Sequence, residues 1–139
     1  MENIINLYGN TGVGKTTLIK EFVFEKNTLI LDFQGGACVE YKNTTNIVSI
    51  KGRRTKTNCL ELLNNISNDY KYIFFENFTH IFPLIEKQII NMLLKNKQTF
   101  FIFVTHDKLT INGVSIIYFE IKNNSLVENN KQIFKNFMQ

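Results

Sequence analysis

Short apolar runs alternate with segments of helical periodicity along the chain. Several of the apolar runs lack polar alternation, as expected for strands that are buried on both faces of a sheet. The predicted strands are NIINLY (3–8), TLILDF (28–33), NIVSI (46–50), YKYIFFE (70–76), TFFIFVT (99–105) and VSIIYFEIK (114–122). The predicted helices are 14–26, 57–68, 80–96 and 129–138. This order predicts an α/β fold with a mostly parallel sheet and helices on both faces.

The third helical segment and the tail show the clearest helical spacing. In the segment 80–96, Pro83 fits within the first turn, and His80 is expected to pack or to cap the helix. The core positions of that segment are Ile81, Ile85, Ile89, Met92 and Leu93. The tail has Ile133, Phe134, Phe137 and Met138 at helical spacing, which predicts that it docks on the sheet or on another subunit.

The end of the last strand predicts a turn. Asn123 and Asn124 follow it within KNNSLVEN, and asparagine tolerates the positive φ angles of a tight hairpin. We therefore expect the sheet to end in an antiparallel hairpin.

Composition limits the class of protein. A chain of 139 residues with 44% hydrophobic residues can bury one sizeable core, so we expect a single domain over residues 1–139. Cys38 and Cys59 are far apart with no CxxC pair, which predicts free thiols rather than a disulfide or zinc site. The chain lacks a leader pattern and any apolar run of about eighteen residues, so we expect a cytoplasmic protein with no membrane span.

Net charge leaves the partner open. The formal charge of +4 and the pI of about 9.1 permit a polyanion such as nucleic acid, but an ordinary soluble surface explains them equally well.

The most specific motif is a phosphate-binding loop. The first strand leads directly into GNTGVGKT (9–16), which matches GxxxxGK[ST], and the helical TLIKEFVFEK follows. In such a loop, successive backbone N–H groups surround phosphate oxygens, and the positive end of the following helix adds to the attraction. The nucleotide-binding residues expected here are Gly9, Asn10, Thr11, Gly12, Val13, Gly14, Lys15, Thr16 and Thr17.

Individual roles follow from the side chains of this loop. Lys15 is expected to reach the β- and γ-phosphates, Thr16 to offer its hydroxyl to Mg²⁺, and Thr17 to contact the α-phosphate. The alternative, a glycine-rich turn that contains Lys-Thr by chance, does not explain the strand before the loop and the helix after it.

The nucleotide and its metal are predicted from later segments. Guanine-specific proteins read the base with Asn-Lys-x-Asp after a late strand, whereas here THDK follows FFIFV, and NKQT (96–99) precedes that strand without the Asp. ATP is therefore favoured. Glu76, at the end of YKYIFFE, is the expected acid for the Mg²⁺ shell, although a surface acid at the end of a strand is the alternative.

Taken together, GNTGVGKT, LILDFQGG, YIFFENFTHIFP, FFIFVTH and IIYFEIKNNSLVE resemble the ordered elements of the RecA-like ATPase core. In their pattern of residue types they are most similar to small phage-encoded nucleotide-binding and single-strand-annealing proteins. The second strand of those proteins typically has an apolar run, Asp, a variable residue, Glu and two glycines. The resemblance implies that the acid that polarises the attacking water falls on Gln34.

An amide at that position changes the expected chemistry. Gln34 can orient a water molecule but cannot accept its proton, so slow ATP turnover is expected. Asp32 lies two residues earlier on the same face of an extended strand and is a candidate substitute acid. Glu76 and the neighbouring Asn77 are further candidates.

Two further segments are candidates for function. The resemblance places a γ-phosphate sensor after the next strand, at Thr105 and His106, where an ordinary loop histidine is the alternative. KGRRTK (51–56) contains both arginines of the chain, and its cations are Lys51, Arg53, Arg54 and Lys56. This loop is expected to grip a phosphate backbone or to supply an arginine to a neighbouring subunit's nucleotide, with a solvated loop as the alternative.

Three functions remain open from the sequence. The first is an ATPase that acts on nucleic acid within a homo-oligomer. The second is a nucleotide-dependent binding or assembly module with little catalysis, which Gln34 favours. The third is a small-molecule kinase, which is disfavoured because the chain has no arginine-rich lid and leaves little room for an acceptor pocket.

Overall fold

A computed structural model of the chain describes residues 3–10, 15, 18–20, 27–34, 47–64, 66, 70–121 and 126–138. Within these residues six strands form one sheet in the order β3-β2-β4-β5-β1-β6. The strands are β1 (Ile4–Tyr8), β2 (Thr28–Asp32), β3 (Ile47–Ser49), β4 (Tyr72–Glu76), β5 (Phe100–Thr105) and β6 (Ile117–Glu120). Three helices are α3 (Lys56–Asn64), α4 (Phe82–Lys95) and α5 (Leu126–Met138).

All five strand pairings in the sheet are parallel. The predicted α/β class is therefore confirmed, and each predicted strand is present with ends that differ by a few residues. The helix predicted over 14–26 is described only at residue 15 and residues 18–20, which are helical.

The predicted antiparallel hairpin at the end of the sheet is wrong. β6 pairs parallel with β1, and α5 over residues 126–138 confirms the helix predicted at 129–138. Phe134 and Met138 are one helical turn apart and almost completely buried, so helix formation covers apolar sheet surface that a hairpin would leave open. Asn123 and Asn124 lie outside the described residues. The tail docks on the sheet as expected, except that Ile133 is 54% exposed.

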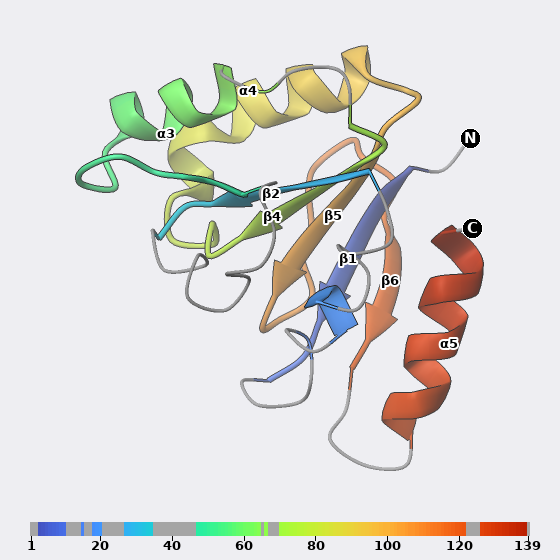
Figure 1. Ribbon diagram of the computed structural model, residues 1–139. Coiled ribbons are helices and arrows are strands. Elements are labelled where there is room, and N and C mark those ends of the chain that lie inside the picture. Colours follow the sequence, from blue (N-terminus) through green and yellow to red (C-terminus); the bar gives the residue numbers. More distant parts are fainter. Residues whose placement is uncertain are drawn as a thin grey trace.

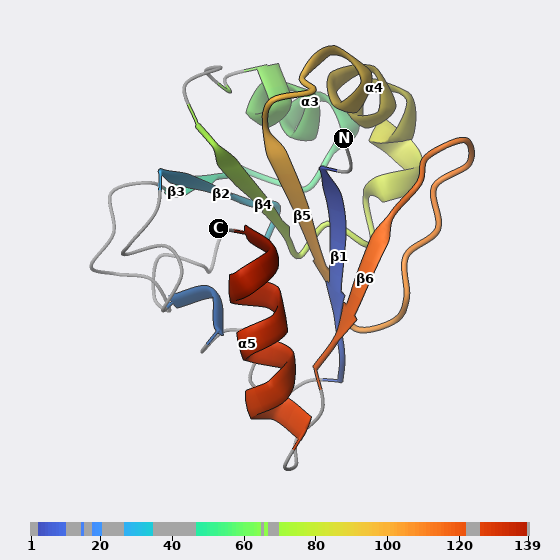
Figure 2. The ribbon, with the colours of Figure 1, turned by 90° about the vertical axis from the view of Figure 1, so that its right-hand side faces the viewer.

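The helices cover both faces of the sheet (Figures 1 and 2). α3 and α4 lie over one face, while α5 and the short helical segment at 18–20 lie over the other. Each strand alternates between the two cores, as Leu31 and Phe75 pack toward α3 and α4 while Ile30 and Phe74 pack toward α5.

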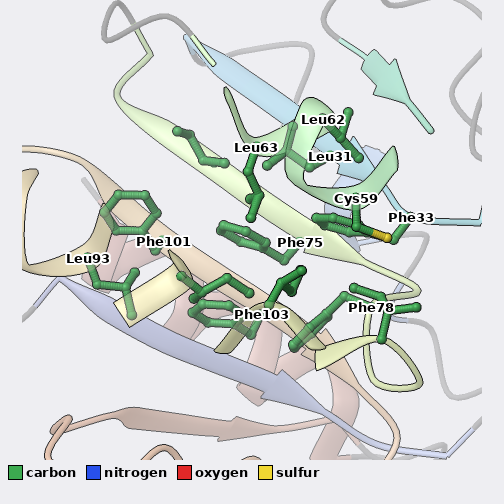
Figure 3. Close-up of a cluster of buried hydrophobic side chains, with 14 of the residues drawn as sticks. Leu31, Phe33, Cys59, Leu62, Leu63, Phe75, Phe78, Leu93, Phe101 and Phe103 are labelled. Atoms are coloured by element: carbon green, nitrogen blue, oxygen red, sulfur yellow. The ribbon is translucent and has the colours of Figure 1, made fainter. Parts of the chain in front are cut away.

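An aromatic cluster centred on Phe75 fills the core under α3 and α4 (Figure 3). The Phe75 ring stacks on Phe103 with ring centroids 4.5 Å apart, and it contacts Phe33, Phe78 and Phe101 at 6.2 to 6.3 Å. These five rings come from β4, β5 and the segments that follow β2 and β4. The cluster therefore joins the three adjacent strands β2, β4 and β5.

α4 begins as the sequence predicts, with Pro83 at the start of the helix, where its missing N–H costs nothing. Ile81, Ile85, Ile89 and Leu93 are buried, and Met92 packs against the same core while remaining partly exposed. No helix in the described part of the chain is both long enough and apolar enough to cross a membrane.

Replacing Phe75 with Ala is expected to destabilise the fold by about 3–5 kcal/mol, because the surrounding rings cannot collapse into the cavity. Urea denaturation measures the change. Leu94→Ala is the matched control, since Leu94 is 57% exposed and its truncation should cost less than about 0.5 kcal/mol. Equal losses for the two variants would contradict the central place of Phe75.

Candidate functional site

The carboxyl ends of the parallel strands gather polar groups at one edge of the sheet. Gly9 follows β1, Asp32 ends β2, Glu76 ends β4 and Thr105 ends β5. β1 and β5 are neighbours whose following segments leave toward opposite faces, because residues 18–20 pack on the α5 side and Ile111 packs on the α4 side. Ligands of open α/β sheets bind at such a switch point.

Lys15 lies at this switch point. Its Nζ donates to the carbonyl oxygen of Gly9 and, over 3.1 Å, to that of Thr105. The Gly9 N–H donates to the same Thr105 oxygen at 3.1 Å. The predicted phosphate-binding lysine is therefore held between the ends of β1 and β5.

Burial controls the electrostatics of Lys15. Desolvation lowers the pKa of its ammonium below the ordinary value of 10.5, while the carboxylates of Glu76 and Asp107 act in the opposite direction. Both carboxylates therefore lie close enough to interact with the ammonium. A cation that is partly removed from water and flanked by acids suits a site for phosphate and a divalent metal.

Asp32 and Glu76 are partners in the register of β2 and β4. Paired positions of neighbouring parallel strands point to the same face, and alternation places both carboxylates on the α5 side, the side of the 18–20 helix. Glu76 is 6% exposed and Asp32 is fully buried. The structure thus places the two predicted acids side by side, and Glu76 is the one that interacts with Lys15.

Asp32 is bound by groups of the protein. Its Oδ1 accepts from the Gln34 backbone N–H at 3.0 Å and from Asn77 Nδ2 at 3.3 Å, and its Oδ2 accepts from Ser49 Oγ at 3.3 Å. Asn77 has a φ of 57°, a left-handed conformation that asparagine tolerates better than most residues. Asp32 therefore anchors the turns that follow β2 and β4.

A polar hollow of about 430 Å³ opens beside these turns. It brings together Gln34 and His106, two of the predicted site residues, with Asn77 from the β4 end. Its described lining is Gln34, Asn77, Thr79, His80, Val104, Thr105, His106, Asp107, Lys108, Leu109 and Thr110. His80 is exposed, and α4 has Ile81 at its N-cap with no side-chain capping bond, so the expected packing or capping role of His80 is wrong.

The basic loop 51–56 lies at the carboxyl end of the edge strand β3, away from Lys15. Lys51, Arg53, Arg54 and Lys56 are all exposed. The loop is ordered by its own bonds: the carbonyl of Arg53 accepts from Asn58 Nδ2 and from the Thr55 N–H, both at 2.8 Å. Thr55 Oγ1 in turn accepts from the Asn58 N–H at 3.2 Å, as an N-cap of α3 does.

Part of the predicted site lies outside the described residues. These positions are Thr11, Gly12, Val13, Gly14, Thr16 and Thr17, together with Cys38. Asn10 is described and exposed, and Cys59 is a free, buried cysteine whose thiol pKa is raised by burial. Among the described residues, no three His, Cys, Asp or Glu side chains form a metal-binding group. Glu76 remains suited to Mg²⁺, which takes few protein ligands and retains water.

Two polar residues of this site, Asp107 and Asn6, were not among the residues predicted from the sequence. Asp107 interacts with Lys15, and the only signal for it was its place in THDK, directly after an apolar strand. Asn6 is fully buried in the middle of β1 and bonds the segment after β5. A lone asparagine inside the apolar run NIINLY was its signal.

Comparison with known proteins supports a nucleotide-binding assignment. A family model described as an AAA domain matches residues 1–109. This range includes β1 to β5 and all of the site residues named above except Thr110. Searches of curated proteins and of solved structures found no significant match.

Lys15→Met is expected to change the pH dependence of stability. The lowered pKa means that the unfolded chain binds more protons than the folded one between that pKa and 10.5. Stability of the natural protein should therefore rise with pH through this window, and the rise attributable to Lys15 should be absent in the variant. Urea midpoints in buffers that span the window measure it. Parallel curves for the two proteins would contradict the desolvation of Lys15.

Proposed function

The chain belongs to the AAA domain family and is a nucleotide-binding domain of ATPase type; we propose that it binds ATP with Mg²⁺, hydrolyses it slowly and acts on nucleic acid. The observation that supports this most directly is Lys15 at the β1/β5 switch point beside Glu76 and Asp107. RecA-like organisation is part of the proposal.

Lys15 and Glu76 have different proposed roles, with Lys15 at the phosphates and Glu76 at Mg²⁺. The ammonium of Lys15, which donates to two backbone carbonyls, is placed to turn to the β- and γ-phosphates. Glu76 and Thr16 would hold Mg²⁺, which neutralises charge on the phosphate oxygens when it is bound. Gly9 and Asn10 begin the backbone cradle that the sequence predicts.

Gln34 and Asp32 make slow turnover the expected outcome. The Gln34 side chain is exposed on the polar hollow together with His106, where it can orient a water molecule without accepting its proton. Asp32 is buried and accepts three hydrogen bonds from protein groups, which supports an anchoring role over that of a proton acceptor. His106 is the proposed sensor of the γ-phosphate.

The basic loop 51–56 is the proposed contact with nucleic acid. Four exposed cations surround the N-terminus of α3, and the first turn of that helix contains no acid. Cations are unfavourable at the positive end of a helix, and a bound phosphate backbone would relieve their repulsion.

The same loop bears on assembly. Four strand spacings separate β3 from β1, a distance of about 19 Å, so Arg53 and Arg54 do not reach the phosphates of their own subunit. Within a homo-oligomer, either arginine could serve the nucleotide of a neighbour, as the sequence suggested.

Two other functions remain as alternatives with distinct support. A binding module with little catalysis is supported by Gln34 in place of a carboxylate. A small-molecule kinase gains support from the polar hollow, because its 430 Å³ gives the room for an acceptor that the sequence did not predict.

Hydrolysis of radiolabelled ATP, measured with and without single-stranded DNA over a range of protein concentrations, separates these functions. Stimulation by DNA supports the proposal, and a rate per subunit that rises with concentration supports a shared site. Binding without turnover supports the module, and turnover only with an added acceptor supports the kinase. Lys15→Ala is the control, since loss of the phosphate-loop cation should remove both binding and turnover.

Gln34→Glu is expected to raise the ATPase rate, because it restores a base without changing the length of the side chain. A full general base is worth about 10²- to 10⁴-fold, so even partial recovery is visible above a slow background. Asp32→Asn serves as the comparison. If it abolishes hydrolysis in a folded protein while Gln34→Glu has no effect, Asp32 rather than residue 34 is the working acid.

Replacing Arg53 and Arg54 together with Ala is expected to weaken DNA binding and to reduce its salt dependence. Loss of two phosphate contacts should lower the slope of log K against log salt by about 1.4 for single strands. The matched control is Lys95→Ala with Lys97→Ala. This pair removes two exposed cations just before β5, at the amino ends of the strands. An equal effect of both pairs would indicate a general charge effect instead of a contact at the loop.

A further inference from the structure

Asn6 is an unusual residue for its place in the fold. It is fully buried in β1, between Ile5 and Leu7, and β1 has a neighbouring strand on each side. Burying an amide costs free energy unless its hydrogen bonds are replaced. The hydrogen bonds of Asn6 therefore identify the part of the structure that this costly buried amide holds in place.

Within the described part of the chain, the Asn6 side chain makes three hydrogen bonds, to the end of β5 and the segment after it. Its Nδ2 donates to the Phe103 carbonyl and to Thr105 Oγ1, both at 2.9 Å, and its Oδ1 accepts from the Leu109 N–H at 2.7 Å. The backbone donor at Leu109 requires an acceptor, which fixes the orientation of the amide. These bonds tie Asn6 to one short segment, residues 103–109.

The bonds continue from Thr105 to the site. Thr105 Oγ1 accepts from Asn6 and donates to the Asp107 carbonyl at 2.6 Å. The backbone carbonyl of the same Thr105 accepts from Lys15 Nζ and from the Gly9 N–H. One residue therefore connects the buried amide to the phosphate-loop lysine.

The far end of the segment is also held. Tyr118, in β6, donates its hydroxyl to the Leu109 carbonyl at 2.6 Å. Between the two anchors, at Thr105 and Leu109, lie His106 and Asp107, which line the polar hollow. The turn that would face a terminal phosphate is therefore held at both ends, at Thr105 by Asn6 and at Leu109 by Asn6 and Tyr118.

We propose that Asn6 is a positioning residue for the nucleotide site, which acts through Thr105 to hold the His106–Asp107 turn against Lys15. Asn6 itself touches no nucleotide. This role rests on the proposed function, because it concerns the same phosphate site.

The test compares Asn6→Leu, Thr105→Val and Thr105→Ser. The first two remove the amide or the hydroxyl with little change in volume, and Thr105→Ser restores the hydroxyl. For Asn6→Leu and Thr105→Val, kcat for ATP hydrolysis should fall by about 10²-fold, as expected for a small misplacement of groups at the reacting centre. Thr105→Ser should recover most of the loss.

Preference for ATP over ADP gives a second readout that requires no hydrolysis. Since the turn lies where a terminal phosphate would be, Asn6→Leu and Thr105→Val should reduce the ratio of the two affinities, measured by calorimetry. The matched control is Asn3→Leu. Asn3 is also buried, and its amide donates to the carbonyls of Asn96 and Thr99 at the opposite edge, so its loss should lower stability without changing either readout.

The outcomes separate the two levels of inference. A folded natural protein that binds no ATP overturns both the proposed function and the role of Asn6. A natural protein that binds ATP, with unchanged kcat and ATP preference in folded Thr105→Val, overturns the role of Asn6 alone. Equal effects of Asn3→Leu and Asn6→Leu also overturn it, because they reduce Asn6 to general stabilisation.

Discussion

Parallel pairing of β1 with β5 is the constraint on which the site depends. The pairing aligns Tyr8 with Thr105, so the carboxyl ends of β1 and β5 lie side by side. The Thr105 carbonyl can then accept from Gly9 and from Lys15 together. Because the chain turns to opposite faces after these two strands, Lys15 lies at a switch point of the kind where open α/β sheets bind their ligands.

The buried polar side chains near the carboxyl ends of the strands have a specific structural role. Asn6 and Asp32 are both fully buried, and each is satisfied by donors and acceptors from turns that follow the strands. An apolar core would hold the sheet together without them, as the stacked rings around Phe75 do. Their bonds instead specify the shape of the turns that carry Gln34, Asn77, His106 and Asp107, which is what a phosphate site requires.

The two ends of the carboxyl edge differ in their electrostatics. Near β1, a partly desolvated lysine lies beside two carboxylates, an arrangement suited to a triphosphate with its metal. Near β3, four exposed cations stand without an acid in the first turn of α3, an arrangement suited to a polyanion without a metal. The proposed nucleotide site and the proposed nucleic-acid contact are thus separated by most of the width of the sheet, so neither ligand would block the other.

The sequence by itself determined the α/β class, the strands and the acids that end two of them, and it predicts the phosphate loop. These features are local: apolar runs, helical spacing and the GxxxxGKT motif need no knowledge of distant residues. It failed at the hairpin, which Asn123 and Asn124 suggested, whereas the helical spacing of Phe134 and Met138 correctly predicted α5. Only the tertiary structure decided that β5 lies between β1 and β4, and this order brings Asn6 to Thr105 and Asp107 to Lys15. Those contacts join residues about a hundred positions apart, and the order of strands in a sheet is set by global packing that no local pattern records.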